Sequence, residues 1–193
     1  EAVPSVASGS PDIWRACALA GVEFWAVDNG FFGAVEKGKH QDVETCYFRM
    51  GWRRPMPRYW PNYLYRGSRF EQFGIVPRPW APDKNGHVLI CPPRGGLARY
   101  YGIVEEEWIK RVRDALPANL RDRVHVRRKG DPGTVIEALR GSLALVAHSS
   151  RVAFDALIAG VPAVETDGIV RDWNGLAPEH VGSGPGVPVV GVP

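Results

Sequence analysis

The chain has 193 residues, of which 45% are hydrophobic, and it carries a formal net charge of +3. This length and apolar content suffice to bury the core of one domain with a smaller companion, so we expect the chain to fold without help. No stretch approaches 18 uninterrupted apolar residues and the first residues lack the basic and apolar regions of a signal peptide, so we expect no membrane insertion and no export.

The three cysteines are far apart in the sequence and show no Cys-x-x-Cys or His spacing. The sequence therefore suggests neither a disulfide framework nor a zinc site, and we expect a reducing, cytoplasmic location. There is no Asp-x-Asp motif and no clustered His and Cys set, so any ligand binding is predicted to be independent of metal.

The N-terminal portion, residues 1–86, is predicted to be largely irregular. A short helix is expected over residues 12–21, followed by a strand over 22–30 that leads into a turn at Asp28-Asn29-Gly30. Residues 51–86 contain six prolines, which makes regular structure improbable there, and we expect no second helix before residue 100.

Basic charge is concentrated in the middle of the chain. Residues 49–69 contain six arginines, five Trp or Tyr residues and no acid. Guanidinium groups beside aromatic faces suit phosphates and stacked bases, so this segment is a candidate surface for an acceptor or a nucleic acid. The alternative is a proline-rich segment whose aromatic residues cover the core while its arginines stay solvated. The candidate residues with a predicted role are Arg49, Trp52, Arg53 and Arg54.

From residue 87 onward, strand and helix patterns alternate through short connections. This alternation predicts an α/β fold with a Rossmann-like, doubly wound parallel sheet in residues 87–193. Strands are expected over 87–92, 123–129, 143–148 and 161–166, and helices over 104–116, 131–141 and 150–160. A glycine-bearing loop with Gly95 and Gly96 is expected after the first of these strands, where its flexible backbone would lie near a bound phosphate.

Two adjacent serines, Ser149 and Ser150, fall where the strand over 143–148 meets the next helix. Ligands of such sheets sit at the carboxyl ends of the strands, where the N–H groups at a helix start attract anions. We therefore expect the two hydroxyls and the backbone N–H groups of residues 150–152 to bind a phosphate. An ordinary helix cap is the alternative for Ser150.

The run "HSSRVAFDALIAGVPAVE" resembles the nucleotide-sugar half of GT-B-fold glycosyltransferases, in particular bacterial capsule-type and sialyltransferase-like enzymes. More loosely, "DNGFFG" followed by "CYFRMGW" is similar to glycosyltransferase-like proteins encoded by bacteriophages. The resemblance covers roughly residues 87–170 and implies a nucleotide-sugar donor. The residues that it implicates in nucleotide or phosphate binding are Arg127, Arg128, Lys129, Ser149 and Ser150, with Asp155 at the acidic helix position.

Four further groups complete the candidate site. His148 and Arg151 flank the serines, although a histidine buried at a strand end and bonded to the backbone is an equal alternative for His148. Glu165 ends the next strand, where the resemblance implies contact with a ribose or donor-sugar hydroxyl, and a solvated loop acid is the alternative. Asp28 is a candidate general base for an acceptor hydroxyl, with stabilisation of the Asp-Asn-Gly turn as the alternative.

The resulting functional hypothesis is a metal-independent glycosyltransferase without a cofactor, which transfers a sugar from a nucleotide donor to an acceptor such as modified DNA. A GT-B enzyme commonly has two such domains, so residues 1–86 would have to supply a minimal acceptor side. The alternative is a non-catalytic nucleotide- or nucleic-acid-binding protein on the same scaffold, because a fold alone does not establish activity.

Overall fold

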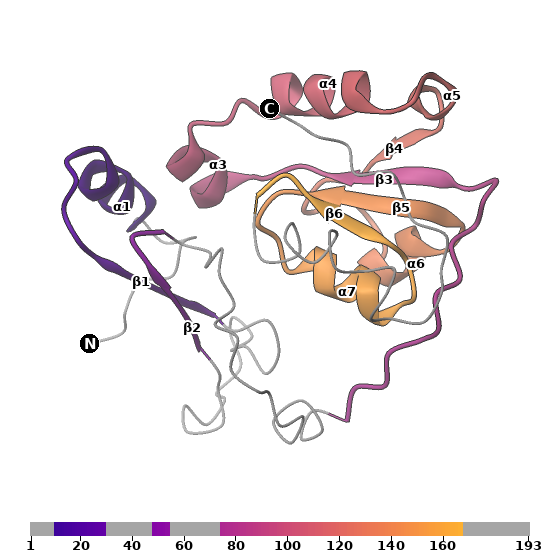
Figure 1. The fold of residues 1–193 in the computed structure, drawn as a ribbon, viewed down its shortest axis with the longest axis horizontal. Coiled ribbons are helices and arrows are strands. Elements are labelled where there is room, and N and C mark those ends of the chain that lie inside the picture. Colours follow the sequence, from indigo (N-terminus) through magenta and orange to yellow (C-terminus); the bar gives the residue numbers. More distant parts are fainter. Residues whose placement is uncertain (1–9, 30–47, 55–73, 168–193) are drawn as a thin grey trace. The chain divides into compact units, whose positions relative to one another are not determined.

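The computed structural model describes residues 10–29, 48–54 and 74–167. These residues belong to two compact units (Figure 1). The first unit lies within Glu1–Ile75 and Gly95–Gly102, and the second within Val76–Arg94 and Ile103–Pro193. Residues 76–86, grouped by sequence with the N-terminal portion, therefore pack with the second unit, whereas residues 95–102 pack with the first.

In its described residues, the first unit has two short helices and one antiparallel strand pair: α1 (Ser10–Leu19), α3 (Gly95–Tyr101), β1 (Trp25–Asn29) and β2 (Phe48–Trp52). Its core forms around the buried side chains of Trp14 and Ala26, against which Phe24, Leu97 and Tyr100 pack. The predicted helix and first strand are confirmed with small shifts in their bounds. Strand β2 was not predicted, because its five residues "FRMGW" carry a glycine and an arginine and lie at the start of the proline-rich region.

Helix α3 contradicts the expectation of no second helix before residue 100. Gly95 and Gly96 are its first residues rather than part of a loop, and Gly95 has a φ of +58°. Two glycines disfavour a helix intrinsically, but packing decides most helical stability in proteins. Here Leu97 and Tyr100 pack against the buried cluster of Trp14 and Ala26, and this packing stabilises a helix that the local sequence does not favour.

The second unit is built on a parallel sheet of four strands: β3 (His87–Cys91), β4 (Val124–Val126), β5 (Ser142–Ala147) and β6 (Ala163–Glu165). Their order across the sheet is β4-β3-β5-β6. The helices between them are α4 (Glu105–Ala115), α5 (Ala118–Arg121), α6 (Val135–Leu139) and α7 (Val152–Ile158). The predicted alternation of strands and helices is confirmed, with the short helix α5 as an unpredicted addition.

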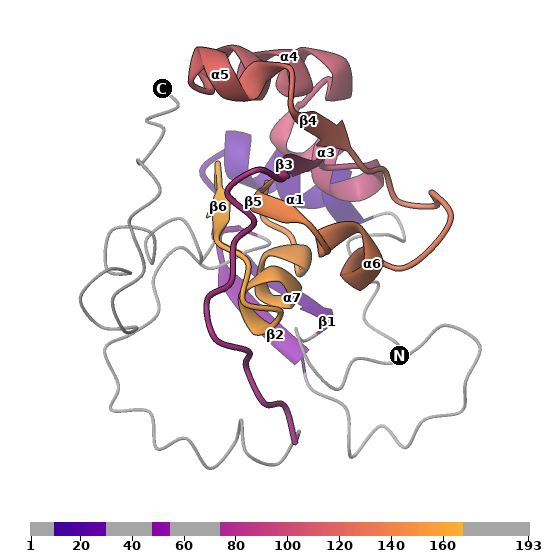
Figure 2. The ribbon, with the colours of Figure 1, turned by 90° about the vertical axis from the view of Figure 1, so that its right-hand side faces the viewer.

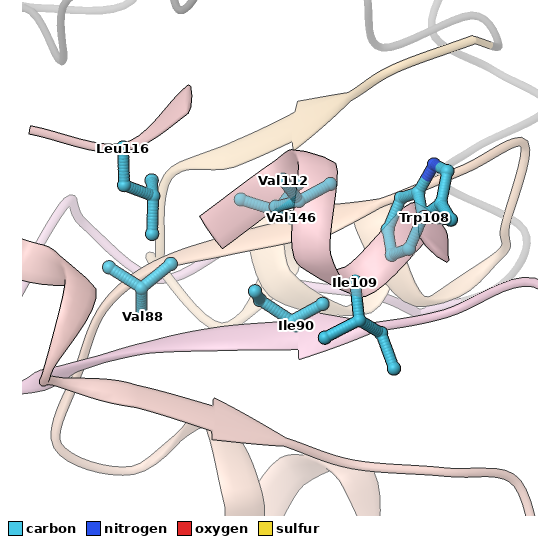
Figure 3. Packing of buried hydrophobic residues seen from close by; sticks show 7 residues of the cluster. All are labelled: Val88, Ile90, Trp108, Ile109, Val112, Leu116 and Val146. Carbon is cyan, nitrogen blue, oxygen red and sulfur yellow. The ribbon is translucent and has the colours of Figure 1, made fainter. Parts of the chain in front are cut away.

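Helices cover both faces of this sheet (Figure 2). Helix α4 lies on one face, where its buried residues pack on alternate strand residues (Figure 3). This cluster contains Trp108, Ile109, Val112 and Leu116 on the helical side and Val88, Ile90 and Val146 on the sheet. Helices α6 and α7 lie on the other face (Figure 1), and Leu89 and Leu145, which alternate with the first set, are fully buried. The unit is therefore a mixed α/β structure with three layers.

The extended segment 76–86 is bonded to the second unit by its backbone. The N–H groups of Arg78 and Ala81 donate to the carbonyls of Ile158 and Gly160, and that of Asp83 donates to Ser142. A Cβ atom at Gly160 would lie 2.2 Å from the carbonyl oxygen of Pro79, so this close approach requires glycine. The segment has no helix or strand of its own, as its prolines predict.

In the part of the chain that the structure describes, no helix is both long enough and apolar enough to cross a membrane.

Candidate functional site

The strand order of the second unit reverses between β3 and β5. The chain passes from β3 outward to β4 and then returns to the opposite side of β3 to form β5. In open parallel sheets, ligands bind beyond the carboxyl ends of the strands where such a reversal occurs. The residues that follow the two strands here are Pro92, Pro93 and Arg94 after β3 and His148, Ser149 and Ser150 after β5.

Ser149 lies at this reversal in an unusual backbone conformation. Its φ is +47°, and its side chain is buried, with 2% of the residue exposed. Its N–H donates a hydrogen bond of 2.6 Å to the carbonyl oxygen of Asp167, beyond the end of β6. A left-handed conformation costs a residue with a Cβ atom about 1–2 kcal/mol, and such strain gathers at functional sites.

Ser150 begins the turn that leads into α7. Its Oγ accepts a hydrogen bond of 3.4 Å from the N–H of Val152, the first residue of α7, although the capping position itself is held by Arg151. Its own N–H donates to Oε1 of Glu165 at 2.7 Å. Two of the three N–H groups that the sequence predicted for a phosphate therefore have partners within the protein, and an incoming phosphate would have to replace them.

Glu165 is a nearly inaccessible carboxylate, with 2% of the residue exposed. It lies at the end of β6 in register with Ala147 at the end of β5, which brings it beside the turn with the two serines. The alternative of a solvated loop acid is therefore wrong, because the residue is buried. The hydrogen bond to Ser150 joins two predicted site residues that are 15 positions apart in the sequence.

His148 is buried and is held by two residues that the sequence analysis did not identify. A hydrogen bond of 2.7 Å joins its Nδ1 to Oγ1 of Thr166, and the same oxygen accepts a hydrogen bond of 3.2 Å from Nε1 of Trp108. The rings of Trp108 and His148 also meet edge to face, with their centroids 6.4 Å apart. In the sequence, Trp108 has the spacing of a core residue in an amphipathic helix. No local signal therefore indicated its contacts with Thr166 and His148.

Arg127 uses its guanidinium group to hold the loop after β4. It donates to the carbonyl oxygens of Pro132 and Gly133, at 3.0 Å and 2.6 Å. Lys129 in the same loop is exposed, and its carbonyl oxygen accepts a hydrogen bond from Arg94. Of these two predicted phosphate-binding cations, Lys129 is therefore accessible to a ligand, whereas the guanidinium group of Arg127 is already hydrogen-bonded to carbonyls of its own loop.

An ion-pair network joins the loops after β3 and β4 to the start of α4. Arg128 donates to Glu105 at 2.6 Å and to Glu106 at 2.7 Å, and Arg94 lies 3.4 Å from the other oxygen of Glu105. The hydrogen bond to Glu105, and then that to Glu106, raises the pKa of Arg128. Because most of these side chains are substantially exposed, the network orients the loops rather than contributing much to stability.

On α7, Arg151 is exposed and lies 3.8 Å from the carboxylate of Asp155. Burial raises the pKa of Asp155, and the charge of Arg151 opposes this effect.

Cys91 ends β3 at the carboxyl edge of the sheet, the edge at which the two serines follow β5. Burial raises the pKa of its thiol to about 12, although the charge of the nearby Arg127 acts to lower it, so we expect the thiol to stay protonated at neutral pH and to be a poor nucleophile.

The remaining predicted residues belong to the first unit. Gly95 and Gly96 open α3, and the register of the β1–β2 pair places Asp28 opposite Arg49. Asp28 lies within β1 rather than in a turn; Gly30, the third residue of that predicted turn, lies outside the described residues. Trp52 and Arg53 are exposed at the end of β2, whereas Arg54 is partly buried.

Within the described ranges, no group of three or more His, Cys, Asp or Glu side chains is placed to hold a metal ion. In comparisons with known proteins, the chain matched no family model, no curated protein and no solved structure.

Proposed function

We propose that the second unit is a Rossmann-like nucleotide-binding domain of the kind that forms the donor half of GT-B glycosyltransferases. In this proposal the protein binds a nucleotide-activated sugar and transfers the sugar to an acceptor without a metal ion. The observation that carries it is the buried Ser149 with its positive φ, at the reversal of strand order between β3 and β5. Ligands of open α/β sheets bind at this reversal, and backbone strain accumulates at such sites.

The polar groups around Ser149 suit different parts of a nucleotide. Hydroxyl groups such as that of Ser149 donate to phosphate oxygens, and the exposed Lys129 and Arg151 supply positive charge for the departing nucleotide. Glu165, when ionised, would repel a phosphate, but a carboxyl oxygen accepts hydrogen bonds from ribose or sugar hydroxyls. We therefore assign Glu165 to a hydroxyl of the donor and the cationic groups to its phosphates.

A non-catalytic nucleotide-binding protein is the second candidate. The observation that favours it is the hydrogen bond from the N–H of Ser150 to Glu165. This bond places a carboxyl group where the phosphate was expected to bind. Binding without transfer would need only the second unit. Transfer additionally needs an acceptor surface and a group that accepts a proton from the acceptor hydroxyl, for which Asp28 remains the predicted candidate.

Calorimetric titration of the full chain with nucleoside mono- and diphosphates and their sugar conjugates tests the binding step. We expect one base to bind in the micromolar range with no added metal, and EDTA to leave the affinity unchanged. Absence of binding by every nucleotide would overturn the proposal. Release of nucleotide from the bound sugar donor, measured with and without acceptor, then separates the two candidates: release supports the transferase, and binding without any release supports the non-catalytic protein.

A further inference from the structure

Two tryptophans lie exposed side by side on the antiparallel pair of the first unit. Trp25 begins β1 and Trp52 ends β2, and the register makes them direct cross-strand partners. Their ring centroids are 4.7 Å apart with a tilt of 57° between the planes. The residues are 57% and 42% exposed, although tryptophan is highly buried in most proteins. An exposed aromatic pair of this kind indicates a contact surface for a ligand.

Arg53 is fixed beside this pair by its backbone. Its φ is +59°, so Arg53 and Ser149 are the two non-glycine residues with a positive φ in the ranges that the structure describes. Its N–H donates to the carbonyl oxygen of Phe24, and its own carbonyl oxygen accepts a hydrogen bond from the hydroxyl of Tyr100. The guanidinium carbon then lies 5.9 Å from the centroid of the Trp52 ring. The backbone of Arg53 is thus held by hydrogen bonds in a conformation that places its guanidinium group beside the Trp52 ring.

The charge of Arg53 is matched by an acid. Glu23, which precedes β1 in the chain, forms an ion pair with the Arg53 guanidinium, and both side chains are more than half exposed. The surface made by Trp25, Trp52, Glu23 and Arg53 is therefore close to neutral. It combines apolar ring faces with exposed hydrogen-bond donors on Arg53 and acceptors on Glu23.

We propose that this surface, the tryptophan platform, binds a sugar ring of an acceptor glycan. The faces of a sugar ring carry C–H groups that pack on indole rings, while its hydroxyls both donate and accept hydrogen bonds and so match Glu23 and Arg53 together. A nucleic-acid strand fits less well, because Glu23 already neutralises Arg53 and would repel a phosphate backbone. The inference rests on the proposed function, since it names the acceptor class of that transferase.

Binding of oligosaccharides by the full chain tests the platform without any nucleotide. The protein is applied to an array of neutral and acidic oligosaccharides, and the affinity for the best-bound one is then measured by calorimetry. We expect a neutral oligosaccharide to bind, with Trp52→Ala and Trp25→Ala each weakening it about tenfold or more and Trp52→Phe retaining most of the affinity. Leu19→Ala is the matched control, because Leu19 is an exposed apolar residue of the same unit at 80% exposure, and it should leave the affinity unchanged.

Several results would overturn the inference. These are the absence of binding to every glycan on the array, equal binding by the tryptophan variants and the Leu19 control, or binding of an oligodeoxythymidine strand that weakens steeply with salt and depends on Trp52 and Arg53. The last result would assign the platform to single-stranded nucleic acid. Nucleotide binding is measured separately on the same protein, so a failure here with intact nucleotide binding removes this inference alone, whereas glycan binding without nucleotide binding removes the proposed function.

Discussion

The backbone N–H of Ser150 donates a hydrogen bond of 2.7 Å to the buried carboxylate of Glu165. This bond links the turn after β5 to the end of β6 and places a carboxyl group at the start of α7. A carboxylate that accepts a backbone N–H at this position stabilises the helix start, and its removal leaves a buried donor without a partner.

Replacement of Glu165 tests this bond directly. Glu165→Ala should lower the free energy of unfolding by about 1–3 kcal/mol, whereas Glu165→Gln retains an acceptor oxygen and should lower it less. Urea unfolding of the purified variants measures both effects. Equal losses for the two variants would show that the negative charge, and not the hydrogen bond, is what the fold requires.

The paired serines are expected to contribute to nucleotide affinity. Replacing Ser149 and Ser150 together with alanine should weaken nucleotide binding by about 1–3 kcal/mol, the range for losing hydrogen bonds to a charged group. Ser142→Ala is the matched control, because Ser142 is equally buried at the opposite end of β5. The control should lower stability without changing nucleotide affinity, and unchanged affinity in the folded double variant would reduce the serines to structural roles.

The positive φ of Ser149 predicts that one substitution lowers nucleotide affinity without lowering the free energy of unfolding. Ser149→Gly relieves a positive φ and should hold the free energy of unfolding constant or raise it by up to about 1 kcal/mol, while nucleotide affinity falls with the lost hydroxyl. Thermal unfolding and calorimetric titration measure the two quantities on one sample. A large loss of stability would contradict the interpretation of strain retained for function.

The two basic residues of the loop after β4 should behave differently. Arg127→Ala removes hydrogen bonds to the carbonyls of Pro132 and Gly133 and should destabilise the protein by about 1–3 kcal/mol. Lys129→Ala removes an exposed charge and should leave stability unchanged while it lowers nucleotide affinity and the salt dependence of that affinity. Lys110→Ala is the control, because it removes an exposed charge from α4, where Lys110 pairs with Asp114. It should leave the nucleotide affinity and the salt dependence of that affinity unchanged. A shift in melting temperature alone for Lys129→Ala would contradict its role in binding.

The thiol of Cys91 should be unreactive in the folded protein. Burial raises its pKa from 9.0 to about 12, so the folded state holds the proton more tightly than the unfolded state. The corresponding stability is fully present below pH 9 and is lost as the pH rises toward 12. Alkylation by iodoacetamide at pH 8, followed by mass spectrometry of the Cys91 peptide, should be at least about a hundredfold slower than in urea. Comparable rates in the two states would contradict the burial.

Local pattern was sufficient for the elements of the second unit, with the exception of the short helix α5. Apolar runs of strand length and helices with periodic apolar residues predict the alternation from residue 87 onward, because both signals depend on neighbours within a few positions. The same pattern placed Ser149 and Ser150 at the junction between β5 and α7, where the structure has them. Helix α3 was not predicted because its stability comes from packing on the cluster of Trp14 and Ala26, which lies about 70–80 residues earlier in the chain.

The sequence by itself determined the strand–helix alternation and the position of the serines along the chain, since these depend on periodicity and turn residues. Only the tertiary structure decided the order β4-β3-β5-β6 and therefore which strand ends meet. It alone joined Ser150 to Glu165 and His148 to Thr166 and Trp108, bonded residues 76–86 to the second unit, and paired Trp25 with Trp52. Such contacts depend on strand order, register and packing between distant segments, which a short stretch of sequence does not specify.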